Sequence, residues 1–121
     1  MNWEELNPIL EKSCNDSSLT VRLPVLQRVH QLLKDVEQPK DLHQLGKVSS
    51  TLLKTFTLYQ DAKSKKMVTT IFEDILALNP EFLEKYTLFV LENVAKKPAT
   101  KAVTDYLNLL EWVHAFLRFI S

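Results

Sequence analysis

The chain has 121 residues, of which 45% are hydrophobic; this content is enough for one ordinary core and too high for a disordered chain. Fifteen basic and fifteen acidic residues give a formal net charge of zero, which excludes binding to nucleic acid or anionic lipid through overall charge. The chain has a single glycine. This argues against hairpins, phosphate-binding loops and dinucleotide folds, which need glycine at tight or closely approached backbone.

Cysteine content and hydropathy indicate the compartment. Cys14 is the only cysteine, so an internal disulfide is impossible, and no apolar run approaches the ~20 residues that span a bilayer. No signal peptide precedes Trp3 and Glu4. We therefore expect a soluble cytoplasmic protein in a reducing compartment, without membrane contact.

The first two helices are predicted from capping residues and hydrophobic spacing. Asn2 followed by Glu5 forms a capping-box pattern, which starts a helix over about residues 3–14. After a polar turn, apolar residues recur at three- and four-residue spacing over 21–36. This period predicts a second amphipathic helix.

Prolines and polar caps divide the rest of the chain into four helices. The third is predicted from Leu42 to about Tyr59, and the fourth follows the cap Asp61 and extends to about residue 78. The fifth begins near Glu81, and the sixth extends from about Thr100 to the end of the chain.

Six helices form three consecutive antiparallel pairs, at about 3–36, 41–78 and 81–121. Their spacing of roughly 40 residues matches HEAT or armadillo repeats, so we predict an all-α HEAT-type solenoid forming a single N-terminal segment of a longer array. Asp16 precedes Arg22 and Asp61 precedes Lys65, and HEAT repeats use such acidic and basic residues in a ladder between neighbouring repeats. A four-helix bundle with extra helices is the structural alternative.

The sixth helix is apolar over well over half of its circumference, which predicts neighbours on two sides. We therefore expect the solenoid to be truncated at its C-terminal end, with a next repeat, or a second copy of the chain, covering a continuation face. The residues of this face are Tyr106, Leu109, Trp112, Phe116 and Phe119.

Residues that could support catalysis do not form a recognisable constellation. Glu111 and His114 have the Glu-x-x-His spacing of di-iron bundles, but that site needs a second such motif and two further carboxylates. His30, His43 and Cys14 have no partner pattern, and a buried structural thiol is the preferred interpretation of Cys14. We predict a protein that is not an enzyme and has no cofactor and no metal.

Lysines at two helix starts are the candidate contact site. Lys63, Lys65 and Lys66 lie in the first turn of the fourth helix and Lys101 in that of the sixth, where each opposes the helix dipole by ~0.3 to 1 kcal/mol. Helix stability does not explain them, so we interpret them as a basic rim for phosphate. The alternative is a solvated turn with one lysine paired to Asp61.

Three segments resemble a known family: NWEELNPILEKS from Asn2, SKKMVTTIFEDILALNP from Ser64, and PATKAVTDYLNLLEWVHAFLRFIS from Pro98. They are similar to the N-terminus of the fungal general-control translational activators, very large HEAT-repeat proteins. The resemblance implies a scaffold that binds ribosomes, works with an ABC-family ATPase and helps uncharged tRNA activate the starvation kinase of initiation factor two alpha. In that family the kinase and ATPase regions lie elsewhere, and no family motif maps onto the lysines.

The function expected from these features is that of a non-catalytic, ribosome-binding scaffold segment. The alternative is a purely structural N-terminal cap that covers the end of the solenoid. The polar residues of the first helix fit a cap: Glu4, Glu5, Glu11 and Lys12.

Overall fold

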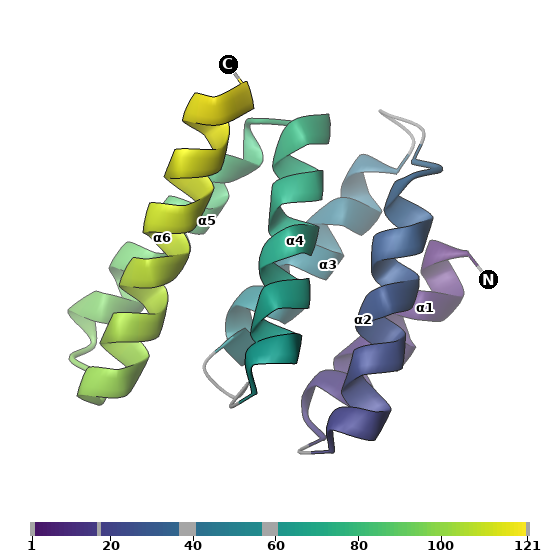
Figure 1. Cartoon of the computed structure of the whole chain (residues 1–121), viewed down its shortest axis with the longest axis horizontal. Helices are drawn as coiled ribbons and strands as arrows, with labels where there is room; N and C mark the ends of the chain where they lie inside the picture. The colour runs from purple at the N-terminus through teal and green to yellow at the C-terminus, as the bar shows by residue number, and fades with distance from the viewer. Residues whose placement is uncertain (1, 17, 37–40, 57–60, 121) are drawn as a thin grey trace. The chain divides into compact units, whose positions relative to one another are not determined.

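The computed structural model describes residues 2–16, 18–36, 41–56 and 61–120, with the side chains of Leu19, Leu117, Phe119 and Ile120 outside the description. Within these ranges the chain is all-helical and contains no strand. The helices are α1 (Trp3–Cys14), α2 (Leu19–Leu33), α3 (Leu42–Thr55), α4 (Ala62–Leu78), α5 (Phe82–Ala95) and α6 (Thr100–Ile120) (Figure 1). The predicted helical fold and its helices are confirmed. α2 ends three residues before the predicted boundary, and the predicted end of α3 lies outside the described residues.

The start of α1 shows how a capping residue marks the beginning of a helix. The side-chain oxygen of Asn2 accepts a hydrogen bond from the backbone N–H of Glu5 at 2.9 Å. This bond satisfies one of the N–H groups that a helix start leaves without a partner, and two carboxylates, Glu4 and Glu5, lie in the same turn.

The contacts group the chain into two compact units, residues 1–71 and 72–121, and the boundary falls inside α4. The sequence predicts one segment of three pairs, with α3 and α4 as the middle pair, and this pairing stays a prediction. The boundary between the compact units lies within α4, whose later part carries Phe72, a residue that packs on Tyr86 of α5. Such a division depends on tertiary contacts, which helical periodicity does not report.

In the first unit, α1 packs against both α2 and α3. The amide of Asn7 on α1 donates to the side-chain oxygen of Gln44 on α3 at 2.7 Å, so a polar bond accompanies the apolar contact. The fully buried residues of this unit include Leu10, Leu26, Leu45, Val48, Leu52 and Val68. Trp3 is also buried, which favours core packing over an interface role for that residue.

In the second unit, α5 packs against α6 and aromatic rings form the centre of the core. The rings of Phe72 and Tyr86 lie 4.8 Å apart between their centroids, and those of Phe89 and Tyr106 lie 6.0 Å apart in an edge-on arrangement. Offset and edge-on ring pairs are the favoured aromatic geometries. These pairs join α5 to the later part of α4 and to α6.

The helices α1 and α5 differ in how much of their surface other helices cover. α1 buries six of its 12 residues, because both α2 and α3 lie against it. α5 has 14 residues and buries two, Tyr86 and Val90. Five of the other α5 residues are exposed and seven are half-buried, although the sequence of this helix is rich in apolar residues. No helix, over its described residues, is long and apolar enough to cross a bilayer.

Candidate interaction surfaces

A charged cluster connects the start of α2 with the start of α4. One carboxylate oxygen of Asp61 accepts a hydrogen bond from Arg22 Nη2 at 2.9 Å, and the other accepts from the backbone N–H of Ser64 at 2.7 Å. The side chain of Arg22 is only 5% exposed and that of Asp61 is 28% exposed. Asp61 thus caps α4 and pairs with a buried guanidinium 39 residues earlier in the chain.

Electrostatics keeps Asp61 ionised. Partial burial by itself raises the pKa of Asp61, but the hydrogen bond from the Ser64 N–H and the positive charge of Arg22 outweigh it, so this pKa lies below its ordinary value. The acidic residue that precedes α4 therefore pairs with the basic residue early in α2. This is the kind of contact between successive helix pairs that the ladder pattern predicts.

The predicted basic rim is divided between the two units. Lys63, Lys65 and Lys66 lie together in the first turns of α4 in the first unit, whereas Lys101 is the second residue of α6 in the second unit. Lys63 and Lys66 are exposed, but Lys65 is half-buried and already has an interaction partner. The alternative of a lysine paired to Asp61 is not needed to satisfy that carboxylate, because Arg22 and Ser64 do so.

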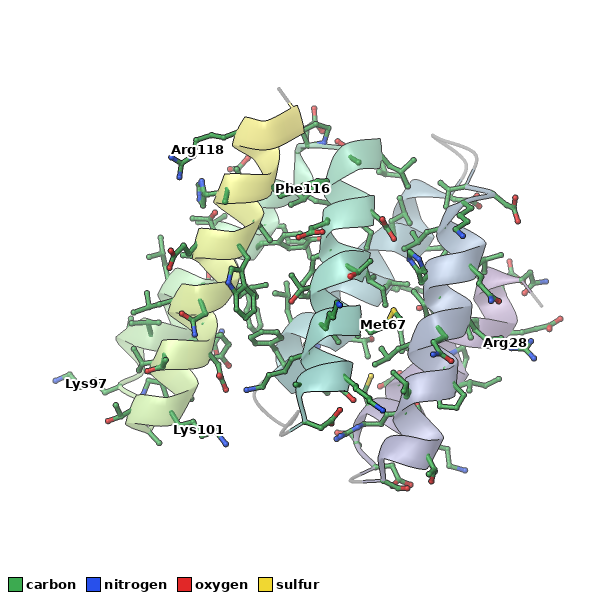
Figure 2. The ribbon with its side chains drawn as sticks, in the orientation of Figure 1. Arg28, Met67, Lys97, Lys101, Phe116 and Arg118 are labelled. Atoms are coloured by element: carbon green, nitrogen blue, oxygen red, sulfur yellow. The ribbon has the colours of Figure 1, made fainter. Side chains whose placement is uncertain are left out.

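Two further lysines, Lys96 and Lys97, lie in the turn between α5 and α6, where positive charge is favoured by the end of α5. Both are exposed, and Figure 2 shows Lys97 and Lys101 extending outward from this turn. Lys97 has a φ of 53°, in the left-handed region that glycine occupies most readily. Pro98 after the helix end was the available signal, because helices commonly end in a left-handed residue shortly before a proline.

The structure changes the predicted continuation face on α6. Tyr106 and Leu109 are 7% and 0% exposed, so these two members of the predicted face do not reach solvent. The reason is that the Tyr106 ring packs edge-on against Phe89 of α5 within the same unit. Coverage of the face by a next repeat or a second copy stays a prediction. Trp112 is 41% exposed and is available for contact.

The remaining members of that face are less informative. Phe116 is half-buried, and Figure 2 shows it on the side of α6 that is turned toward the later part of α4. The side chain of Phe119 lies outside the described residues. Trp112 is therefore the member that the structure supports as an outward-facing contact.

The side chains that could take part in catalysis or metal binding lie apart from one another. His30, His43 and His114 lie on three different helices, α2, α3 and α6, and Cys14 is buried. Over the described part of the chain, no three His, Cys, Asp or Glu side chains come close enough to hold a metal ion. The pKa of Glu73 is raised above its ordinary value. Partial burial is the larger cause, and the negative charge of the neighbouring Asp74 is the second.

Over its described residues the chain is an all-α protein in which neighbouring helices pack within each of two compact units. The chain is 46% identical over 123 aligned positions to a segment of the eIF-2-alpha kinase activator GCN1 of Saccharomyces cerevisiae, a match that covers 100% of this chain. This confirms the resemblance drawn from the sequence. The chain spans 4% of the length of that relative. No family model matches the chain, and no solved structure matches it.

Proposed function

We propose that this chain is a non-catalytic scaffold segment of a cytoplasmic translational activator and that it contributes an electrostatic contact to the ribosome. The observation that carries the proposal is the 46% identity along the whole chain to a segment of the yeast activator. A role in translational control follows from that relative's function. Binding to the ribosome, a response to uncharged tRNA, and cooperation with an ABC-family ATPase and the starvation kinase belong to the full-length protein under this proposal.

The proposed contact is formed by Lys63 and Lys66. Lys101, which is exposed but, like Lys65, already has an interaction within the chain, is a separate contact in the second unit. Two exposed cations at the start of α4 are disfavoured by the helix dipole. Asp61, the nearest carboxylate in sequence, is already engaged by Arg22. The charge of these lysines is therefore directed outward, where it suits phosphate groups. A net-neutral chain needs such a local patch for binding to RNA.

The test is co-sedimentation of the 121-residue chain with ribosomes across a salt series. Each lysine that neutralises a phosphate adds roughly 0.7 to 0.9 to the slope of log affinity against log salt. The double variant Lys63→Glu with Lys66→Glu should therefore lose somewhat under two units of slope while keeping its helicity.

The matched control reverses two exposed lysines of the same unit at helix ends, Lys34→Glu with Lys54→Glu. Each of these lysines lies at the C-terminal end of its helix, where the helix dipole favours positive charge. Helix stability therefore explains their positions. Equal loss of the slope of log affinity against log salt in the two double variants, or no loss in either, would contradict the proposed contact.

A structural cap is the second candidate, because the outward residues of α1 are polar: Glu4, Glu5, Glu11 and Lys12 are all exposed. Under this alternative, neither lysine variant changes ribosome association. Continuation of the solenoid and self-association through α6 are also proposals, now supported by Trp112 alone among the expected residues.

A further inference from the structure

We infer that the outer face of α5 is a docking surface for a lysine- or arginine-rich amphipathic helix of a partner protein. This surface, the α5 stripe, consists of Glu81 at the helix start followed by Glu84, Leu88, Leu91 and Glu92. The inference is independent of the proposed ribosome contact, because it concerns a different unit and the opposite charge.

Helical spacing places the stripe on one side of α5. Its members follow one another mainly at three- and four-residue intervals, which keeps them on one face of a helix. The opposite side carries the two buried residues, Tyr86 and Val90. Leu88 and Leu91 are 51% and 56% exposed, among the highest values for the large hydrophobic side chains that the structure describes.

The α5 stripe also has a shallow depression, into which a partner's side chain could fit. An open depression at the start of α5 is lined by Pro80, Glu81, Leu83, Glu84, Thr87 and Leu88. Its lining is mostly apolar and includes two residues with carboxylates, Glu81 and Glu84. Apolar contact combined with flanking charge is the arrangement by which a groove binds an amphipathic helix.

The stability of α5 does not account for the stripe. Glu84 in the first turn is favoured by the helix dipole, but Glu92 in the last turn opposes it, and no basic residue lies in that turn. Among the described residues, no ion pair or side-chain hydrogen bond engages the carboxylates of Glu81, Glu84 or Glu92. Two exposed leucines add apolar surface that water does not favour.

Charge decides which partner fits. Three carboxylates span twelve residues, about 16 Å along the helix, and border the two leucines. The cations nearest to them in sequence are Lys85, which is half-buried and already has an interaction within the chain, and the exposed Lys96 just after the helix. They repel phosphate groups, and two copies of the chain meeting symmetrically through this face would bring like charges together. A helix with apolar residues three and four apart and basic residues on both sides complements the face in shape and in charge.

The test uses a labelled 18-residue helical peptide with leucines along one face and lysines on both sides, and a second peptide with glutamates in place of the lysines. Fluorescence anisotropy measures their affinity for the 121-residue chain. We expect the lysine peptide to bind in a salt-dependent manner and the glutamate peptide not to bind. Glu84→Lys with Glu92→Lys should weaken the lysine peptide about tenfold and allow the glutamate peptide to bind.

A control variant reverses two exposed carboxylates of the other unit, Glu4→Lys with Glu11→Lys, and should leave the affinity unchanged. The apolar part is tested separately by Leu88→Ala with Leu91→Ala, which should also weaken binding about tenfold. All variants change exposed residues, and circular dichroism verifies their helicity.

Three results would overturn the inference. The first is equal affinity of the two peptides for the unaltered chain. The second is an unchanged affinity of the lysine peptide for the Glu84 and Glu92 variant. The third is sedimentation equilibrium showing a dimer that the leucine variant dissociates, because the face would then be covered by a second copy of the chain.

Discussion

Replacing Phe72 by alanine is expected to lower the free energy of unfolding by about 3 to 5 kcal/mol, the cost of a large aromatic deletion in a packed core. Phe72 is fully buried, and its ring lies 4.8 Å from the ring of Tyr86, which is also fully buried. The alanine would remove the apolar surface that the Phe72 ring buries on folding, and it would also remove one ring of this pair. Because whole domains are stable by only about 5 to 15 kcal/mol, the loss is a large fraction of the total.

Urea denaturation followed by circular dichroism at 222 nm measures this effect. The control is Leu88→Ala, which removes a hydrophobic side chain that is 51% exposed and should cost less than about 1 kcal/mol. A Phe72 variant as stable as this control would show that the ring pair does not hold α4 to α5 in solution.

Replacing Asp61 by alanine is expected to cost about 2 to 4 kcal/mol, because one carboxylate serves both as a helix cap and as the partner of a buried guanidinium. The thermal midpoint should fall by roughly 10 °C for a chain of this size. Asp61→Asn keeps an oxygen for the Ser64 N–H and should recover the capping part of the loss. The matched control is Asp16→Ala, since Asp16 is exposed and, within the described part of the chain, its side chain accepts a hydrogen bond from the N–H of Ser18 alone, at 2.8 Å.

The pH dependence of stability should identify the charged part of this contact. The pKa of Asp61 is lower in the folded state than its ordinary value. The contribution of ionised Asp61 to the free energy of unfolding is therefore fully present above the unfolded-state pKa of about 4. It is lost as the pH falls through the pKa of Asp61 in the folded state. Asp61→Asn should show a smaller loss of stability below about pH 4 than the unaltered chain, and identical acid curves for the two would contradict the assigned ion pair.

The helices were predictable from sequence because their signals are local. Asn2 caps α1 through the N–H of Glu5, as the capping pattern indicates, and the apolar spacing follows the buried residues of α2 and α3. The ladder contact was predictable in kind, because Asp61 and Arg22 occupy corresponding places in successive helix pairs. These features need only spacing and residue type.

The remaining features depend on three-dimensional contacts. α6 carries a wide apolar surface, and sequence does not reveal which part of it meets α5; the packing of Tyr106 on Phe89 decides this. The left-handed conformation of Lys97 is set by the turn and not by the preference of lysine. Helical spacing places Leu88 and Leu91 on the side of α5 opposite Tyr86 and Val90. Their exposed fractions depend on which helices pack against α5, and that is a three-dimensional property.

The central claim is tested most directly in yeast by exchanging the matching segment of the eIF-2-alpha kinase activator for this chain and measuring phosphorylation of eIF-2-alpha during amino-acid starvation. The exchanged activator should support phosphorylation close to the normal level. Introducing Lys63→Glu with Lys66→Glu into the exchanged segment should reduce both ribosome association and phosphorylation, whereas Lys34→Glu with Lys54→Glu should reduce neither. Full phosphorylation with the Lys63 and Lys66 variant, at normal protein levels, would contradict a ribosome contact at the start of α4.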